Sequence, residues 1–386
     1  MEKKRVLIVI GAYLPGYRSG GPQRTIENVC EYYAEQCDIF IITKNHDYAD
    51  NTPYEIPTTK WISKYGVNIM YLKDRDFSYS LFKNYYTQFD TIYTCGLFAK
   101  STYQFMLINR FFHRKNNFYV APMGVFSEGA LSSKPLKKSI FLRVFSALGV
   151  FHNIIWSFTS VKEKKEAEKV IGEKNIDNYI IAEDLPKKYE WEEISQRIQA
   201  SEKGKLKIVF LSRIVAKKNT LKCIEILDHE FGGEIVFDIY GNIEDQSYWN
   251  SCKEILEKLP KNIRVKYCGE ITPDEVVETF LKYDCFLFPT KGENFGHVIY
   301  EALSAGCIPI ISDKTPWSEL GEQKCGIIVE LNNTDGFRAA VKTLLFTETD
   351  DILKQKKNAI LFAEKKYRAA NANSGYSRVF LNENKK

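Results

Sequence analysis

Residues 291–320 read KGENFGHVIYEALSAGCIPIISDKTPWSEL, and they join a glycine-containing loop, an apolar helix pattern, a turn of small residues and a strand pattern. Glu293 and Glu301 stand a little over two helical turns apart in this stretch. If residues 294–296 form a loop, the helix begins directly after the glycine of that loop. The N-terminus of a helix has free N–H groups and a partial positive charge, so it favours binding of an anion. Two carboxylates beside it suit a ligand that is both phosphorylated and rich in hydroxyl groups, such as a nucleotide sugar. The alternative is a solvated helix start with two surface glutamates.

A second pattern lies about 80 residues earlier, where residues 206–219 read LKIVFLSRIVAKKN. The apolar run is typical of a buried strand. It ends at Arg213, and Lys218 follows at the start of a helix pattern. Two cations at this place suit a departing phosphate, on which negative charge grows as its bond breaks. Lys217 is a competing candidate, and an ordinary basic loop is the alternative interpretation.

The third pattern is at the front of the chain. Residues 5–10, RVLIVI, predict a short strand, and Gly20 and Gly21 precede Pro22 at the start of a helix pattern. A strand, a glycine loop and a helix let the backbone approach a phosphate. The glycines do not have the GxGxxG spacing of a dinucleotide site, so this signal is weak by itself.

Together these stretches resemble the retaining family-4 glycosyltransferases, which have the GT-B fold. The resemblance implies that Glu293 lies by the donor sugar, that Glu301 holds the ribose hydroxyls, and that Arg213 and Lys218 neutralise the donor diphosphate. It also implies donor contacts from the glycine loop and from the backbone after the first glutamate, namely Gly20, Gly21, Asn294, Phe295, Gly296 and His297. Two positions depart from the family pattern. His297 stands where the family more often has an aliphatic residue, and Asn219 stands where it usually has glycine.

The order of the apolar runs predicts an α/β protein with two Rossmann-like, doubly wound domains. A chain of 386 residues is natural for two domains. We place an acceptor-side domain at residues 1–183, a polar connection at 184–205 and a nucleotide-sugar-binding domain at 206–365. In the resembling fold these domains face a cleft, and a last helix, here 366–386, crosses back to the first domain. The expected strands are 5–10, 38–43, 68–72, 91–94, 117–121, 153–157, 206–211, 234–240, 263–267, 284–288 and 307–311.

Composition excludes several other classes. The net charge of +5 is too small to indicate a nucleic-acid partner. The nine cysteines form no CxxC pair, which favours reduced thiols and a cytoplasmic protein. We see neither a membrane span nor a signal peptide. The five histidines are scattered, and we expect no metal site and no cofactor beyond the nucleotide-sugar co-substrate. The letters DRD at 74–76 match a metal-binding motif but lie in the first domain, where an acidic turn is the commoner explanation.

Two segments mix basic and large apolar residues: 105–118 and 134–156. Such segments suit peripheral contact with an anionic membrane at the inner face of the cell membrane. The alternative is a pair of packed helices with their basic faces in water.

These patterns predict a retaining, metal-independent glycosyltransferase of the hexosyltransferase type (EC 2.4), with Glu293, Arg213 and Lys218 in the catalytic roles. We expect Arg213 and Lys218 to face solvent in the ligand-free protein, so that replacing them leaves the fold intact. Resemblance alone suggests a glycan or lipid-linked acceptor in the synthesis of an O-antigen, capsule or exopolysaccharide. The alternatives are a GT-B nucleotide-sugar epimerase, an inverting transferase, or a non-catalytic nucleotide-sugar-binding module.

Overall fold

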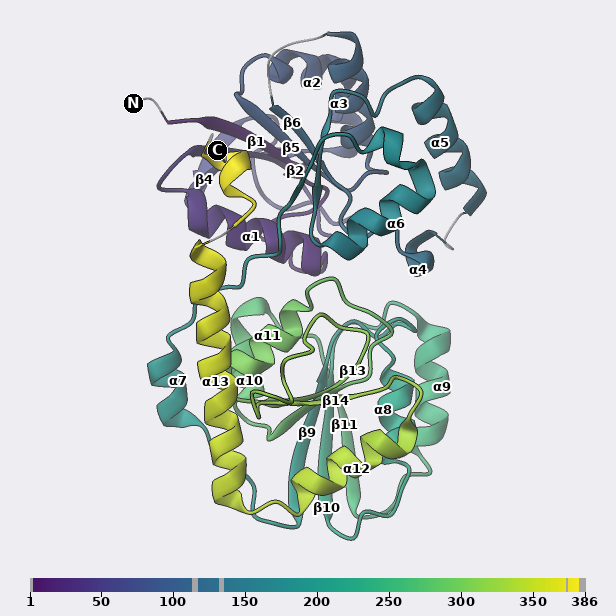
Figure 1. Cartoon of the computed structure of the whole chain (residues 1–386), viewed down its shortest axis with the longest axis vertical. Coiled ribbons are helices and arrows are strands. Elements are labelled where there is room, and N and C mark those ends of the chain that lie inside the picture. Colours follow the sequence, from purple (N-terminus) through teal and green to yellow (C-terminus); the bar gives the residue numbers. More distant parts are fainter. Residues whose placement is uncertain (1–2, 113–116, 132–134, 373, 382–386) are drawn as a thin grey trace. The chain divides into compact units, whose positions relative to one another are not determined.

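The computed structural model describes residues 3–112, 117–131, 135–372 and 374–381 of the chain. The chain divides into two compact units, shown in Figure 1. The first unit comprises Met1–Leu185 together with Ala372–Lys386, and the second comprises Pro186–Asn371.

The first unit contains an eight-stranded sheet in the order β3-β4-β2-β1-β5-β6-β7-β8. Only β3 is antiparallel, and it pairs with β4. The strands are β1 (Arg5–Val9), β2 (Asp38–Lys44), β3 (Trp61–Lys64), β4 (Val67–Leu72), β5 (Thr91–Cys95), β6 (Asn117–Ala121), β7 (Ile155–Phe158) and β8 (Tyr179–Ile181). The helices are α1 (Gly21–Tyr33), α2 (Tyr79–Tyr86), α3 (Lys100–Phe111), α4 (Glu128–Leu131), α5 (Pro135–Ala147), α6 (Val161–Ile171) and α14 (Ser377–Phe380).

The last described residues of the chain complete the core of this first unit. The ring of Phe380 stacks on Tyr33 of α1 at a centroid distance of 5.0 Å, and the ring of Tyr376 lies 6.2 Å from that of Tyr93 in β5. Lys4 donates from Nζ to the carbonyl of Val379 at 2.6 Å. The segment is therefore held both by apolar burial and by a hydrogen bond.

The second unit contains a six-stranded, all-parallel sheet in the order β11-β10-β9-β12-β13-β14. The strands are β9 (Lys205–Leu211), β10 (Glu234–Tyr240), β11 (Ile263–Gly269), β12 (Cys285–Phe288), β13 (Ile308–Ser312) and β14 (Ile327–Val329). The helices are α7 (Trp191–Arg197), α8 (Thr220–Leu227), α9 (Gln246–Leu256), α10 (Val276–Phe280), α11 (His297–Ser304), α12 (Thr334–Leu345) and α13 (Thr349–Ala372).

The order in which the parallel strands are added reverses in the middle of this second sheet. Strands β9 to β11 proceed toward one edge, and β12 to β14 proceed from β9 toward the other edge. Because crossovers between parallel strands are right-handed, this reversal puts α8 and α9 on one face and α10 and α11 on the opposite face, as Figure 1 shows. Ligands of open α/β sheets bind at the carboxyl ends of the strands at such a switch point, here beside β9 and β12.

Every strand that the sequence predicts is present, with small shifts at the ends. Three strands were not predicted: β3, β8 and β14. Each is an edge strand of three or four residues, so it lacks the long apolar run of a strand buried between two neighbours. The predicted polar connection contains α7, whose Trp191 and Ile194 are buried in the core of the second unit.

Candidate active site

The loop after β9 carries Arg213 and is fixed to the loop after β10. Ser212 donates its backbone N–H to Tyr240 at 3.1 Å, and Ile214 donates to Asn242 at 2.8 Å. Gly241 makes this close approach feasible, because a β-carbon there would lie 1.8 Å from the carbonyl oxygen of Ser212. The guanidinium of Arg213 binds Glu244, with Nη1 at 3.0 and 3.2 Å from the two carboxylate oxygens.

Lys218 and Glu293 form a nearly buried ion pair between the loops that follow β9 and β12. The Lys218 Nζ lies 2.7 and 2.9 Å from the two carboxylate oxygens of Glu293. Thr290 donates from Oγ1 to Glu293 Oε1 at 2.8 Å. Burial lowers the pKa of the Lys218 ammonium, and the negative charge of Glu293 works in the opposite direction.

This pair corrects one expectation from the sequence. The Arg213 side chain is 37% exposed, but those of Lys218 and Glu293 are only 13% and 10% exposed. Lys218 therefore does not face solvent, and its replacement removes the partner of a carboxylate that is itself nearly buried. A sequence pattern cannot show this, because the partner stands 75 positions away in the chain.

Asn219 accounts for one departure from the family pattern. Its φ of 64° and ψ of 40° are left-handed, a conformation that glycine adopts freely and that asparagine adopts more readily than most other residues. Its side-chain Nδ2 also donates to the carbonyl of Pro289 at 2.8 Å. Asparagine thus supplies the backbone conformation and, in addition, a bond to the loop after β12.

The loop before α11 ends at Gly296, which also needs to be glycine. Its φ is +82°, and a β-carbon there would lie 3.0 Å from Ile299 Cδ1. No side chain caps the helix at this residue. The Phe295 ring packs against Trp317 at a centroid distance of 5.3 Å, and the Phe295 carbonyl accepts a hydrogen bond from Trp317 Nε1 at 2.5 Å. Both the ring and the backbone carbonyl of Phe295 therefore hold the loop against Trp317.

Two other predicted residues lie on α11 itself. His297 is its first residue, and its ring lies 4.8 Å from that of Phe295. Glu301 follows one turn later and is buried. Carboxylates without a structural or functional role are usually exposed, so its burial sets Glu301 apart from a surface glutamate.

The predicted residues of the second unit thus lie in the loops at the carboxyl ends of β9 and β12 and on α11, the helix after β12. Gly20 and Gly21 belong to the first unit, where Gly20 precedes α1 with a φ of 71°, and their donor contact stays a prediction. Sequence reasoning missed Glu244 and Thr290, which hold Arg213 and Glu293. The segment FPTKGEN contains a weak signal for the bond between Thr290 and Glu293. A hydroxyl three positions before a carboxylate can reach it in a turn.

In the part of the chain that the structure describes, no group of three His, Cys, Asp or Glu side chains is placed so that it could bind one metal ion. The DRD letters form a short 3₁₀ helix, Asp74–Asp76. Asp74 binds Lys44 at 2.8 Å and lies 3.5 Å from His46 Nε2. Metal independence stays a prediction. Across the same described residues, no helix has the length and apolar character needed to cross a bilayer.

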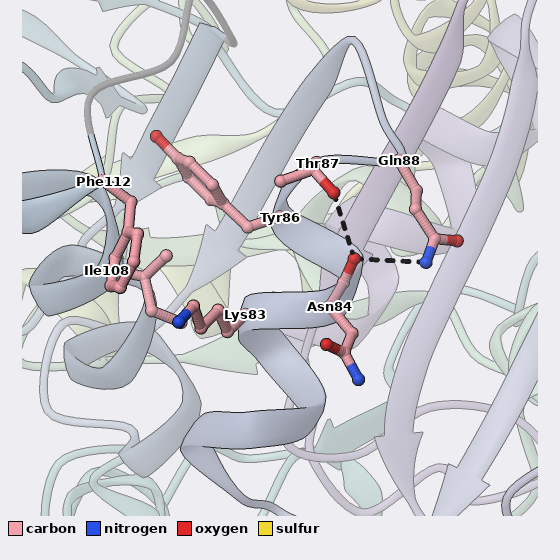
Figure 2. A pocket seen from close by; sticks show the side chains of 7 residues that line it. All are labelled: Lys83, Asn84, Tyr86, Thr87, Gln88, Ile108 and Phe112. Carbon is pink, nitrogen blue, oxygen red and sulfur yellow. Dashed lines mark hydrogen bonds between the residues drawn. The ribbon is translucent and has the colours of Figure 1, made fainter.

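A separate hollow of about 480 Å³ lies in the first unit between α2 and α3. Figure 2 shows its lining, in which Thr87 Oγ1 and Gln88 Nε2 both donate to the carbonyl of Asn84, at 3.4 and 3.1 Å. The lining consists of Lys83, Asn84, Tyr86, Thr87, Gln88, Ile108 and Phe112. None of the predicted site residues is among them.

Comparison with known proteins identifies a matching family and similar folds. Residues 192–365 match the family model described as glycosyl transferases group 1. The sulfoquinovosyl transferase SQD2 of Arabidopsis thaliana is 25% identical over 178 residues, which are 45% of this chain and 33% of that protein. The chain therefore spans about a third of the length of this curated relative.

Several solved structures resemble most of the chain, among them Anabaena Alr3699/HepE and WaaG. Anabaena Alr3699/HepE, solved with UDP-glucose, has a TM-score of 0.70 and 14% identity, over 95% of this chain and 97% of that one. WaaG, a glycosyltransferase involved in lipopolysaccharide biosynthesis, has a TM-score of 0.62 and 12% identity, over 95% of this chain and 99% of that one. The predicted α/β class with two Rossmann-like domains and the predicted GT-B fold are confirmed.

Proposed function

We propose that this protein is a retaining, metal-independent glycosyltransferase, because residues 192–365 match the model of the glycosyl transferases group 1 family in a chain with the GT-B fold. It moves a sugar from a nucleoside-diphosphate donor to a glycan or a lipid-linked acceptor. One observation carries the proposal: Arg213 and the Lys218–Glu293 pair lie at the carboxyl ends of β9 and β12, where the order of the strands reverses, and buried Glu301 lies on α11, the next helix.

The chemistry follows from these charges. Arg213 and Lys218 hold the diphosphate, on which negative charge grows as the bond between the sugar carbon and the phosphate oxygen breaks. The acceptor hydroxyl forms the new bond on the same face of the sugar, and its proton passes to the departing phosphate. In the structure both cations are bound by carboxylates, and when the donor binds, its diphosphate replaces Glu244 and Glu293 as their partner.

The acceptor side of the proposal rests on analogy with named relatives. WaaG is involved in lipopolysaccharide biosynthesis, and the Arabidopsis relative is a sulfoquinovosyl transferase. We place this protein in the cytoplasm, at the inner face of the cell membrane, in the synthesis of a cell-surface polysaccharide such as an O-antigen or a capsule.

A donor screen tests the proposal. A ligand that binds only the folded protein raises its melting temperature, so the UDP-, GDP-, ADP- and dTDP-sugars are compared by thermal shift. The stabilising donor is then incubated with the protein, and slow release of free sugar is expected. Binding without release, with or without acceptors, favours the non-catalytic binding module, and absence of any shift contradicts the proposal.

Glu301→Gln is expected to raise KM for the donor and to leave kcat nearly unchanged. Contacts to the ribose persist from the ground state to the transition state, and losing such uniform binding appears in KM. Steady-state kinetics with varied donor measure this split. If the variant binds the nucleoside diphosphate as tightly as the parent does, the ribose role of Glu301 is wrong. Glu293→Gln serves as the contrasting variant, because it should change turnover or the choice of sugar.

Turnover is expected to survive EDTA. Arg213 and Lys218 supply the positive charge that a divalent ion supplies in metal-dependent enzymes. Initial rates before and after chelation measure the effect, and dialysed protein without chelator is the control. Loss of turnover that manganese or magnesium restores would overturn the metal-free mechanism.

The pH profile of kcat/KM is expected to fall on its alkaline side at lower pH than an ordinary lysine would cause. Burial lowers the pKa of Lys218 in the free protein, so its ammonium loses its proton below the usual value of about 10.4. A neutral amine holds a diphosphate poorly, and kcat/KM reports the free enzyme. Lys218→Arg keeps its charge at these pH values, so its profile should lack this alkaline limb. An unchanged limb in Lys218→Arg would assign it to another group.

A further inference from the structure

Helix α5 has an apolar face that the described residues of the first unit leave exposed. Its inner side packs on α3 through Phe141 and Phe145, whose rings lie 6.3 and 6.4 Å from Tyr103. The opposite side carries a stripe at four-residue spacing, which is one face of a helix. The members of this outer stripe are 77%, 63%, 46% and 54% exposed: Leu136, Ile140, Val144 and Leu148.

Basic residues flank the outer stripe. Lys137 and Arg143 are exposed on α5 beside it. Across residues 91–161 the chain has eight lysines and arginines and a single acidic residue, Glu128. The eight are Lys100, Arg110, Arg114, Lys115, Lys134, Lys137, Lys138 and Arg143. Residues 113–116 and 132–134 lie outside the described part of the chain, so three of these side chains enter only as charges in the sequence.

The end of α3 lies next to the end of this stripe. Arg110 donates from Nε to the carbonyl of Leu148 at 3.4 Å. The next residue, Phe111, is also exposed, as is Phe112. Large apolar side chains at the ends of two neighbouring helices, with basic residues around them, form one amphipathic surface.

We propose that the outer stripe of α5 and its basic flank dock the protein on an anionic lipid bilayer. A helix with an apolar face and flanking lysines or arginines lies in the plane of a membrane interface, with the apolar side chains among the acyl chains and the cations at the lipid phosphates. The role of this docking rests on the proposed function, since docking would bring the enzyme to a lipid-linked acceptor.

A second copy of the chain fits this surface less well. Two copies related by a two-fold axis would place Lys137 and Arg143 of both chains near one another, with no acidic residue of residues 91–161 other than Glu128 to offset them. Like charges across an interface oppose association, whereas anionic lipid phosphates balance the same charges. The charge around the stripe thus selects the bilayer as its occupant.

Vesicle cosedimentation tests this docking. The parent protein is expected to sediment with vesicles of phosphatidylcholine containing phosphatidylglycerol, to bind pure phosphatidylcholine far less, and to dissociate as salt is raised. Ile140→Glu with Val144→Glu should weaken binding at least about tenfold, because two apolar side chains no longer enter the bilayer. Leu361→Glu on α13, at 62% exposure, is the matched control and should bind as the parent does.

Charge removal is tested separately. Lys137→Gln with Arg143→Gln should weaken binding about fivefold for each lost charge. The paired control is Lys354→Gln with Lys357→Gln, two exposed lysines of α13, which should leave binding unchanged.

Melting temperature and donor-induced thermal shift should be unchanged in all these variants, so failure of docking remains distinct from failure of the proposed enzyme. The inference is overturned if the parent protein does not sediment with anionic vesicles. It is also overturned if the outer-stripe variants bind these vesicles as well as the parent does. Self-association of the parent that the outer-stripe variant abolishes, without vesicle binding, would assign the surface to a second copy and likewise overturn it.

Discussion

Arg213→Ala is expected to lower turnover of the proposed transfer by about 10²–10³-fold, or about 2.7–4 kcal/mol of transition-state free energy, the range for one lost donor to a developing oxyanion. The guanidinium stands at the end of β9, beside the switch point of the second sheet. Its position suits contact with the departing diphosphate, on which charge grows only as the bond breaks. The loss should therefore appear in kcat and in kcat/KM together.

The fold should tolerate this change. The pair that Arg213 makes with Glu244 is partly exposed, and such pairs contribute about 0–1 kcal/mol to the free energy of unfolding. Arg264→Ala removes a well-exposed arginine of the same unit and serves as the control for charge, with turnover expected at the parent level. Full activity in Arg213→Ala, and above all in the double variant with Lys218→Ala, would contradict the phosphate assignment.

Lys218→Ala is expected to lower the free energy of unfolding by about 3–5 kcal/mol, the usual cost of removing one partner from a buried ion pair. The variant leaves the Glu293 carboxylate nearly buried, with the Thr290 hydroxyl as the remaining donor among the bonds described above. Turnover should fall as well, because the same ammonium is assigned to the diphosphate. Denaturant unfolding of parent and variant measures the stability loss.

A second change should separate the two roles of Lys218. In Lys218→Met with Glu293→Gln, neither of the two replaced positions carries a buried charge, and the glutamine carbonyl can still accept the hydrogen bond from Thr290. Most of the lost stability should return, while turnover should stay low. If Lys218→Ala is as stable as the parent, the pair is not structurally important; if the double variant recovers turnover, the phosphate role of Lys218 is wrong.

Much of the architecture was predictable because strand signals are local. Runs such as 208–211 (IVFL) and 285–288 (CFLF) are apolar over their whole length, since a strand inside a parallel sheet is buried on both faces. The short edge strands β3, β8 and β14 were not predicted, because an edge strand does not need a continuous apolar run. The predicted GT-B fold is confirmed, and residues 192–365 match the model of the glycosyl transferases group 1 family.

Helix α5 shows where local pattern fails. It is apolar on two opposite sides, so its sequence does not tell which side meets the core. Packing against Tyr103 decides this and leaves the stripe from Leu136 to Leu148 exposed.

The sequence by itself determined the α/β order, the spacing of the site residues and the family that they resemble. Only the tertiary structure decided the partners: Glu293 for Lys218, Glu244 for Arg213, and a left-handed Asn219 between the two loops. The physical reason is that charge pairing and burial depend on which strand ends become neighbours. In this sheet β9 and β12 lie side by side, although more than 70 residues separate them in the chain.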